Sequence, residues 1–120
     1  MTTARRILII EDDTDVRASL AEVLLSEGYE IAEAQDGAEG LTAARHHLPD
    51  LILLDLMMPT MNGWDFRAAQ MTDPAIAPIP VVVISAALPD QVHAIGAVAH
   101  LHKPFDLADL LETVQRHAAA

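Results

Sequence analysis

One short run of residues constrains the fold of this chain more than any other feature. Residues 51–54 are four consecutive aliphatic side chains, and Asp55 follows directly. A strand with one face in water would alternate apolar and polar residues, so this run predicts a strand buried on both faces, as at the centre of a parallel sheet. Pro59 and Gly63 mark a loop soon afterwards. Asp55 is therefore expected at the carboxyl end of the strand, where open α/β sheets bind ligands.

Apolar patterns along the rest of the chain predict alternating strands and helices. The expected strands are residues 7–10, 29–34, 51–54, 81–84 and 99–101. The expected helices are residues 15–26, 37–47, a short helix after Asn62, about two turns within 88–96, and a last helix with Leu107, Leu110, Leu111 and Val114 at helical spacing. Polar alternation in residues 29–34 indicates a sheet edge. This alternation of elements predicts a parallel sheet covered on both faces through right-handed crossovers.

The composition is that of one globular domain and excludes several classes of function. Eighteen acidic and seven basic side chains give the 120 residues a net charge of −11. That charge argues against direct binding to nucleic acid or to an anionic membrane, and it is compatible with holding a divalent cation. The absence of cysteine excludes disulfides and thiolate zinc sites. Since the sequence contains neither a signal peptide nor an apolar run of about 18 residues, a soluble cytoplasmic protein is expected.

The unusual polar residues of the chain all fall at the carboxyl ends of four predicted strands, the first, third, fourth and fifth. Each has an ordinary explanation when taken alone, because such residues commonly cap helices, bond their own loops or lie in solvent. The carboxyl ends of parallel strands meet at one edge of a sheet, however, so these side chains are expected to converge. They are Glu11, Asp12, Asp55, Ser85 and Lys103.

Such a set of groups is suited to phosphoryl transfer. Carboxylates without a histidine or thiol ligand favour a hard cation, Mg²⁺ in the first place and Mn²⁺ as the alternative. A cation, an ammonium and a hydroxyl together neutralise the charge on a transferring phosphoryl group. Asp55 is the candidate nucleophile, because carboxylates accept phosphoryl groups as acyl phosphates. The sequence has no Gly-rich phosphate loop, so a nucleotide is not the natural donor.

Four motifs carry a family resemblance that covers the whole chain, residues 1–120. They are Glu11-Asp12-Asp13 after the first apolar run, residues 50–59 together with Asn62-Gly63, Ser85-Ala86, and Lys103-Pro104-Phe105. In combination they resemble the CheY-like receiver domain of two-component response regulators. The resemblance implies a flavodoxin-like, doubly wound α/β fold with five helices and five parallel strands in the order 2-1-3-4-5.

The resemblance also implies a role for each residue at the strand ends. Asp55 resembles the phosphoacceptor, Ser85 the conserved hydroxyl, and Lys103 the lysine that binds the phosphoryl group. A cis peptide bond is expected between Lys103 and Pro104. A sensor histidine kinase or a histidine phosphotransfer protein would be the phosphoryl donor.

The metal ligands implied by the resemblance include an acidic pair, with one alternative left open. Glu11 and Asp12 resemble this pair around Mg²⁺, and Asp55 and the backbone carbonyl of Met57 complete the protein ligands. Moving the pair by one residue would make it Asp12 and Asp13. Strand alternation turns Asp13 toward the following helix, which favours Glu11 and Asp12.

Two departures from the family pattern lie near the end of the chain. Ser85 and Lys103 are separated by fewer residues than usual, so the fourth helix is expected to be short, displaced or partly unwound. His100 occupies the position of the aromatic residue that switches with the hydroxyl at Ser85. An imidazole can rotate inward as that residue does, but its charge responds to pH.

The preferred functional hypothesis is a stand-alone receiver that signals through an unidentified downstream protein, as a monomer or weak homodimer and not as a turnover enzyme. Alternatively, the chain is a fragment of a longer regulator. Two other functions stay open. A phosphorylation-independent interaction module is favoured by the short fourth helix and by His100. An aspartate-nucleophile phosphatase is disfavoured, because such enzymes carry a second acid where this chain has Met57.

Overall fold

Five parallel strands form one sheet in the order β2-β1-β3-β4-β5. The computed structural model describes residues 4–118. Its strands are β1 (Arg6–Ile10), β2 (Glu30–Ala34), β3 (Leu51–Leu54), β4 (Val81–Ser85) and β5 (Ala99–His102). Its helices are α1 (Thr14–Ser26), α2 (Gly37–His47), α3 (Gly63–Met71), α4 (Pro89–His93) and α5 (Leu107–Ala118). The predicted fold class and strand order are confirmed.

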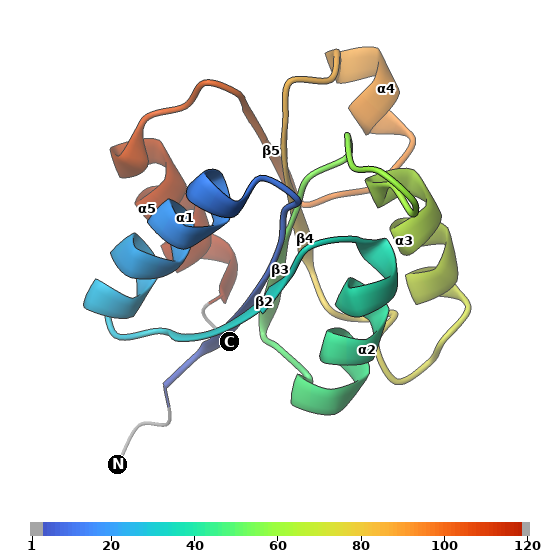
Figure 1. Ribbon diagram of the computed structural model, residues 1–120, viewed down its shortest axis with the longest axis horizontal. Helices are drawn as coiled ribbons and strands as arrows, with labels where there is room; N and C mark the ends of the chain where they lie inside the picture. The colour runs from blue at the N-terminus through green and yellow to red at the C-terminus, as the bar shows by residue number, and fades with distance from the viewer. Residues whose placement is uncertain (1–3, 119–120) are drawn as a thin grey trace.

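The three central strands are buried on both faces, as their unbroken apolar runs predict. Helices α1 and α5 cover one face of the sheet, and α2, α3 and α4 cover the other (Figure 1). Alternate residues of β1 enter different cores: Ile7 and Ile9 pack with α1 and α5, whereas Leu8 and Ile10 pack on the opposite side. The polar strand β2 lies at one edge of the sheet, as predicted.

Side-chain caps define where three helices begin. Asp13 accepts hydrogen bonds from the backbone N–H groups of Asp15 and Val16 at the start of α1. Asp36 and Asn62 cap α2 and α3 in the same way. Leu107 is the first residue of α5 and is exposed, whereas Leu110 and Val114 of the same helix are buried.

The fourth helix has only five residues, which confirms the predicted shortening. Two side chains of α3 hold it and the loop after it. The indole N–H of Trp64 donates to the carbonyl oxygen of Gln91 at 3.0 Å. The guanidinium of Arg67 donates to the carbonyl oxygens of Ile95 at 3.0 Å and Gly96 at 3.2 Å. The position of α4 therefore depends on hydrogen bonds from its neighbour as well as on its own packing.

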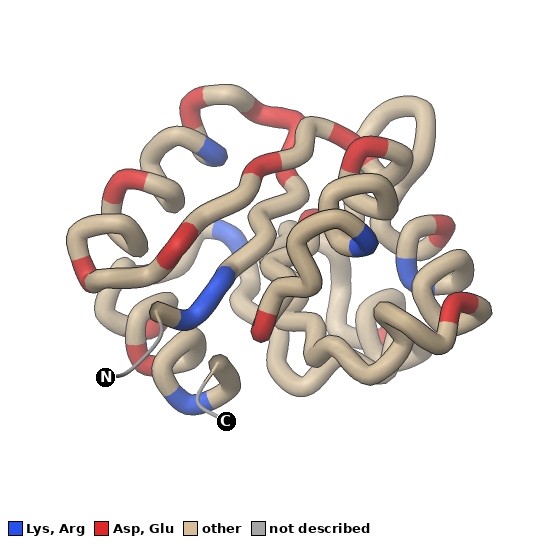
Figure 2. The backbone as a smooth tube through the Cα atoms, turned by 90° about the horizontal axis from the view of Figure 1, so that it is seen from below, with Lys and Arg blue, Asp and Glu red and all other residues tan. Residues whose placement is uncertain are grey.

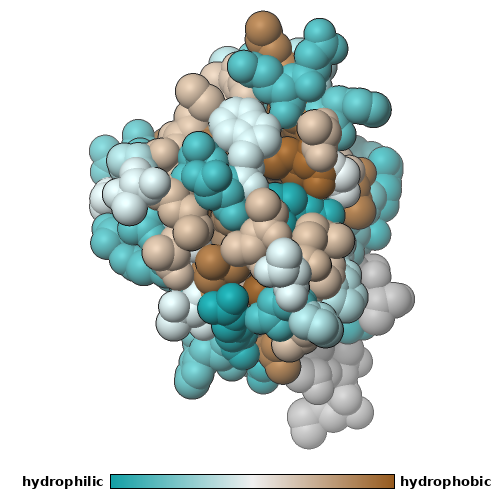
Figure 3. Space-filling view, turned by 90° about the vertical axis from the view of Figure 1, so that its right-hand side faces the viewer, coloured by the Kyte–Doolittle hydropathy of each residue, from teal (hydrophilic) through white to brown (hydrophobic). Residues whose placement is uncertain are grey.

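The surface carries acidic residues along one rim of the chain and scattered apolar side chains elsewhere. Figure 2 shows several acidic positions in red along the upper rim of that view and others spread over the rest of the chain. The face formed by α3 and α4 mixes apolar and polar residues (Figure 3). Leu88, Val98 and Leu107 are among the exposed apolar residues. Among residues 4–118, none of the helices is long and apolar enough to cross a membrane.

The end of α2 yields a test of backbone strain. Leu48 caps this helix in the left-handed region, with φ 46° and ψ 64°, and its side chain is 55% exposed. A Cβ atom is unfavourable in this region by about 1 kcal/mol. We expect Leu48→Gly to be more stable than Leu48→Ala by about that amount, measured as the free energy of unfolding in urea. Equal stability of the two variants would contradict the strain assigned to this residue.

Candidate functional site

The carboxyl edge of the sheet brings three carboxylates together. Strands β1 and β3 are in register, with Ile10 opposite Leu54, and the N–H of Asp55 donates to the carbonyl oxygen of Ile10 at 3.0 Å. Glu11 and Asp55 therefore leave neighbouring strands at the same level. One oxygen from each of Glu11, Asp12 and Asp55 lies within 4.8 Å of the others. Glu11 is 0% and Asp55 4% exposed, so two of these charges are almost fully out of water.

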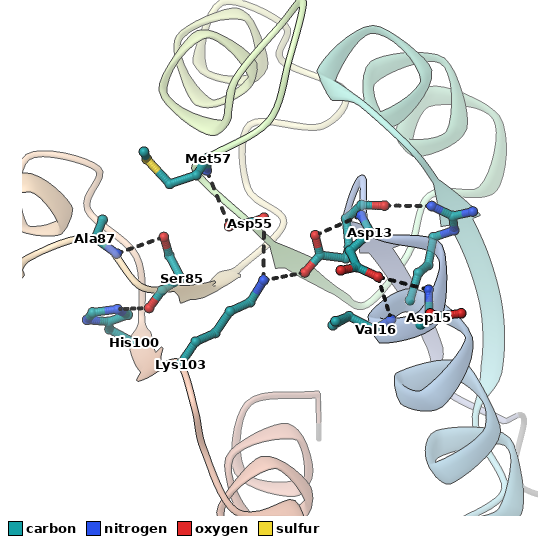
Figure 4. Close-up of polar contacts among 11 residues, drawn as sticks. Asp13, Asp15, Val16, Asp55, Met57, Ser85, Ala87, His100 and Lys103 are labelled. Atoms are coloured by element: carbon teal, nitrogen blue, oxygen red, sulfur yellow. Dashed lines mark hydrogen bonds and ion pairs between the residues drawn. The ribbon is translucent and has the colours of Figure 1, made fainter.

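Lys103 supplies the positive charge at this edge. It follows β5, its backbone N–H donates to the carbonyl oxygen of Ser85 at 3.0 Å, and its bond to Pro104 is cis. Its Nζ lies 2.5 Å from Oε1 of Glu11 and 3.5 Å from Oδ2 of Asp55 (Figure 4). Burial alone would lower the pKa of Lys103, but the hydrogen bond that its ammonium donates to Glu11 and the charges of both carboxylates outweigh burial and raise the pKa. The ammonium therefore stays charged while bridging β1 and β3.

Asp12 is the carboxylate that this ammonium compensates least. Burial, and then the hydrogen bond and charge of Glu11, raise the pKa of Asp12 above its ordinary value of 3.8. A raised pKa means that the ionised form is disfavoured, here by lost hydration and like-charge repulsion. A divalent cation among the three carboxylates would relieve that repulsion. The donor set contains only carboxylate oxygens and no histidine or thiolate, which fits Mg²⁺.

Asp13, the alternative member of the acidic pair, is occupied elsewhere. Its side chain caps α1, and its backbone N–H donates to Oε2 of Glu11 at 3.2 Å. Figure 4 shows its carboxylate directed at the amides of Asp15 and Val16. The three consecutive acids therefore divide between cluster and helix cap, and the cluster contains Glu11 and Asp12.

Met57 lies in the loop directly after the strand that carries Asp55. Its backbone N–H donates to Oδ1 of Asp55 at 3.2 Å, and its side chain is apolar and exposed (Figure 4). The loop thus approaches the carboxylate with its backbone, while the thioether faces solvent.

Ser85 and His100 form a second group of contacts beside the carboxylates. The Ser85 hydroxyl is fully buried and accepts a hydrogen bond from the backbone N–H of Ala87 at 3.1 Å. The Ser85 carbonyl oxygen lies 3.3 Å from Nε2 of His100, a half-buried residue of β5 (Figure 4). In this structure the hydroxyl bonds its own loop, and no hydrogen bond joins it to Asp55 among the described residues.

Arg17 also contacts the carboxyl edge of the sheet, although the sequence predicts no functional role for it. Its Nη1 donates to the backbone carbonyl oxygen of Glu11 at 2.7 Å, and its Nε lies 3.3 Å from Glu33 on β2. A lone arginine in the first turns of an amphipathic helix normally indicates a solvated face. The contact depends on where the chain turns after β1, which no local pattern in the sequence specifies.

Comparison with known proteins identifies the family. A family model described as the response regulator receiver domain matches residues 7–115. The chain belongs to the response regulator receiver family. This receiver is 41% identical over 114 residues to the transcriptional regulatory protein PdtaR of Mycobacterium tuberculosis, an alignment that covers 92% of this chain and 55% of PdtaR. The chain thus spans about half the length of the curated relatives it matches.

Solved structures agree with this family assignment. The chemotaxis protein CheY4 of Vibrio cholerae is 30% identical to this receiver, with a TM-score of 0.89, and the match covers 96% of this chain and 99% of CheY4. The receiver domain of the sensor histidine kinase PA1611 from Pseudomonas aeruginosa has the same fold, with a TM-score of 0.89 at 24% identity and coverage of 98% and 100%. That structure has a magnesium ion coordinated in its active site cleft. Receiver domains are typically phosphoacceptor switches rather than turnover enzymes, and they partner with histidine kinases.

The raised pKa of Asp12 predicts that replacing this residue stabilises the metal-free protein but weakens stabilisation by bound metal. Because this pKa is raised, the stability associated with protonated Asp12 is complete below about pH 3.8 and is lost as the pH rises through the folded-state value. We expect Asp12→Asn to raise the free energy of unfolding at pH 7 in EDTA and to remove stabilisation by added Mg²⁺, both measured by urea titration.

Asp13→Asn is the matched control. It makes the same change in net charge, and asparagine caps helices as well as aspartate does. Its metal-free stability and its response to Mg²⁺ should stay close to wild type. Destabilisation of Asp12→Asn in EDTA, or an intact response of that variant to Mg²⁺, would contradict the electrostatic account of the site.

Proposed function

We propose that this receiver accepts a phosphoryl group on Asp55 from a phosphohistidine donor in a Mg²⁺-dependent reaction in the cytoplasm. The donor would be a sensor histidine kinase or a histidine phosphotransfer protein. The observation that carries the proposal is the cluster of Glu11, Asp12 and Asp55 at one sheet edge, with the ammonium of Lys103 paired to two of these carboxylates. Membership of the receiver family supports the same reaction.

In the proposed reaction the carboxylate of Asp55 attacks phosphorus. A bond forms between one Asp55 oxygen and phosphorus, the nitrogen–phosphorus bond of phosphohistidine breaks, and the imidazole leaves with the electron pair. Lys103 already lies 3.5 Å from Asp55 and would neutralise charge on the phosphoryl oxygens. The product is an acyl phosphate, which water returns to aspartate and inorganic phosphate.

The proposed metal ligands are Glu11, Asp12, Asp55 and the backbone carbonyl of Met57. A bound Mg²⁺ ion would neutralise developing charge on the phosphoryl oxygens, and Mn²⁺ fits the same oxygen donors. Because Lys103 already pairs with Glu11, the ammonium and a cation would share Glu11 or exchange there. The magnesium ion in the PA1611 receiver domain supports this assignment by analogy of fold.

Ser85 and His100 would carry the change of state to the surface. Drawing the Ser85 hydroxyl to a phosphoryl group requires it to leave the N–H of Ala87. The carbonyl of the same residue contacts His100, so this movement reaches β5 directly. The response would be read by a downstream protein through contacts on this side of the sheet.

A phosphorylation-independent interaction module is the second candidate function. The short α4 and the histidine in place of an aromatic switch residue favour it. In such a protein the acidic cluster would be retained for metal binding alone. The two candidates differ in whether Asp55 becomes modified.

Phosphorylation by a small donor tests the proposal. On incubation with acetyl phosphate and Mg²⁺, wild-type protein should gain one phosphoryl group in its intact mass, and Asp55→Asn and EDTA-treated wild type should gain none. Asp65→Asn is a matched control, since this exposed aspartate lies on α3 and should not alter the adduct. An unmodified wild type that binds Mg²⁺ would favour the interaction module, and turnover of phosphate esters would favour a phosphatase.

Met57 predicts slow loss of the phosphoryl group. It lies two residues after Asp55 and is 61% exposed, but its thioether cannot orient or deprotonate water. We expect Met57→Asp to accelerate dephosphorylation by about tenfold or more, because a positioned general base typically contributes at least that much. Met57→Leu should leave the rate unchanged. Decay of the intact-mass adduct measures both rates, and wild-type decay within seconds would count against this assignment.

A further inference from the structure

Arg17 joins three elements at the acidic end of the sheet. It belongs to α1, its Nη1 donates to the Glu11 carbonyl oxygen at 2.7 Å at the end of β1, and its Nε pairs with Glu33 of β2 at 3.3 Å. Its side chain is only 16% exposed. The guanidinium is therefore a fixed part of this edge and not a solvated surface charge.

The carbonyl that Arg17 holds lies where the backbone hydrogen-bond pattern changes. The N–H of Glu11 still donates to the carbonyl oxygen of Ala34 on β2, and the carbonyl oxygen of Asp13 accepts a helical hydrogen bond of α1 from the N–H of Arg17. The Glu11 carbonyl falls between these two patterns. A buried carbonyl without a partner is unfavourable, and the guanidinium supplies that partner.

The same carbonyl belongs to the peptide group that joins Glu11 to Asp12. Its orientation fixes how the two side chains diverge from the backbone. The Glu11 carboxylate is held separately, by the N–H of Asp13 and by Lys103. Contacts to the Asp12 carboxylate are fewer, so its placement relative to Glu11 depends on the peptide between them.

We infer that Arg17 is a positioning residue for the cation site, holding the Glu11–Asp12 peptide so that both carboxylates face one ion. This inference rests on the proposed function, because it concerns the Mg²⁺ that phosphorylation would require. Mg²⁺ demands near-octahedral geometry at short distances, so a small reorientation of this peptide is costly. Residues that orient metal ligands typically contribute about 10- to 100-fold in affinity.

The positive charge of Arg17 affects Mg²⁺ affinity in the opposite direction from its positioning role. A cation beside an acidic cluster repels Mg²⁺, so removal of the guanidinium would tighten binding if charge alone mattered. Positioning and simple electrostatics therefore predict changes of opposite sign. Ca²⁺ adds a second distinction, because it tolerates variable geometry and longer distances. Loss of positioning should weaken Mg²⁺ binding more than Ca²⁺ binding, whereas a change in charge acts on both ions.

Isothermal titration of the metal-free protein with Mg²⁺ and with Ca²⁺ tests this inference. Arg17→Met keeps most of the unbranched side chain and removes the guanidinium. We expect its Mg²⁺ dissociation constant to rise by about tenfold and its Ca²⁺ constant to rise less. Glu33→Gln removes the ion pair but leaves the bond from Arg17 to the Glu11 carbonyl, so its Mg²⁺ affinity should stay close to wild type. Arg17→Lys should be weakened too, since one ammonium replaces a two-armed contact.

Three outcomes have distinct meanings. Unchanged or tighter Mg²⁺ binding by Arg17→Met, or equal losses for both ions, would overturn the inference while leaving the proposed function intact. If Arg17→Met does not fold by circular dichroism, Arg17→Lys decides, and wild-type Mg²⁺ affinity in that variant would overturn the inference. A wild type that binds no Mg²⁺ would overturn the proposed function and this inference together.

Discussion

The ion pair between Lys103 and the carboxylates of Glu11 and Asp55 is the interaction on which the functional edge of this receiver depends. The central strands are apolar and buried on both faces between their ends, so their polar groups are confined to the ends. Parallel pairing then places the ends of β1 and β3 side by side and brings like charges together. The ammonium of Lys103, which directly follows the carboxyl end of β5, offsets that repulsion. The arrangement leaves an excess of negative charge, which suits the site to a divalent cation.

Most of the fold follows from patterns that can be read directly from the sequence. Unbroken aliphatic runs predict the central strands, because only a strand covered on both faces lacks polar alternation. The polar residues of β2 predict an edge strand for the converse reason. Residue spacing between Ser85 and Lys103 predicts a short fourth helix, because there is too little chain for a longer one. Periodicity alone does not show in which turn a helix first meets the sheet, and in α5 Leu107 is exposed while Leu110 and Val114 are buried.

The site divides into parts that a sequence predicts and parts that need coordinates. Motif spacing brings Glu11, Asp12, Asp55 and Lys103 to one edge. It does not say that Lys103 lies nearer to Glu11 than to Asp55, nor that the Ser85 hydroxyl bonds Ala87. Those choices depend on how the competing partners are placed around each group, which motif spacing does not specify. The contact of Arg17 with the backbone carbonyl of Glu11 cannot be predicted from the sequence, because every residue has a backbone carbonyl that could accept this hydrogen bond.

The attachment of α4 has a consequence for how this fold tolerates change. A helix of five residues buries little apolar surface, yet Trp64 and Arg67 secure it and its following loop through main-chain oxygen atoms. Main-chain acceptors are indifferent to the identity of the residue that bears them. Substitutions at the exposed residues of α4 can therefore alter the outer surface of the protein without loosening its anchorage, while Trp64 and Arg67 lie outside the helix. The residues of α4 that form the outer surface are thus different from the residues of α3 that hold the helix in place.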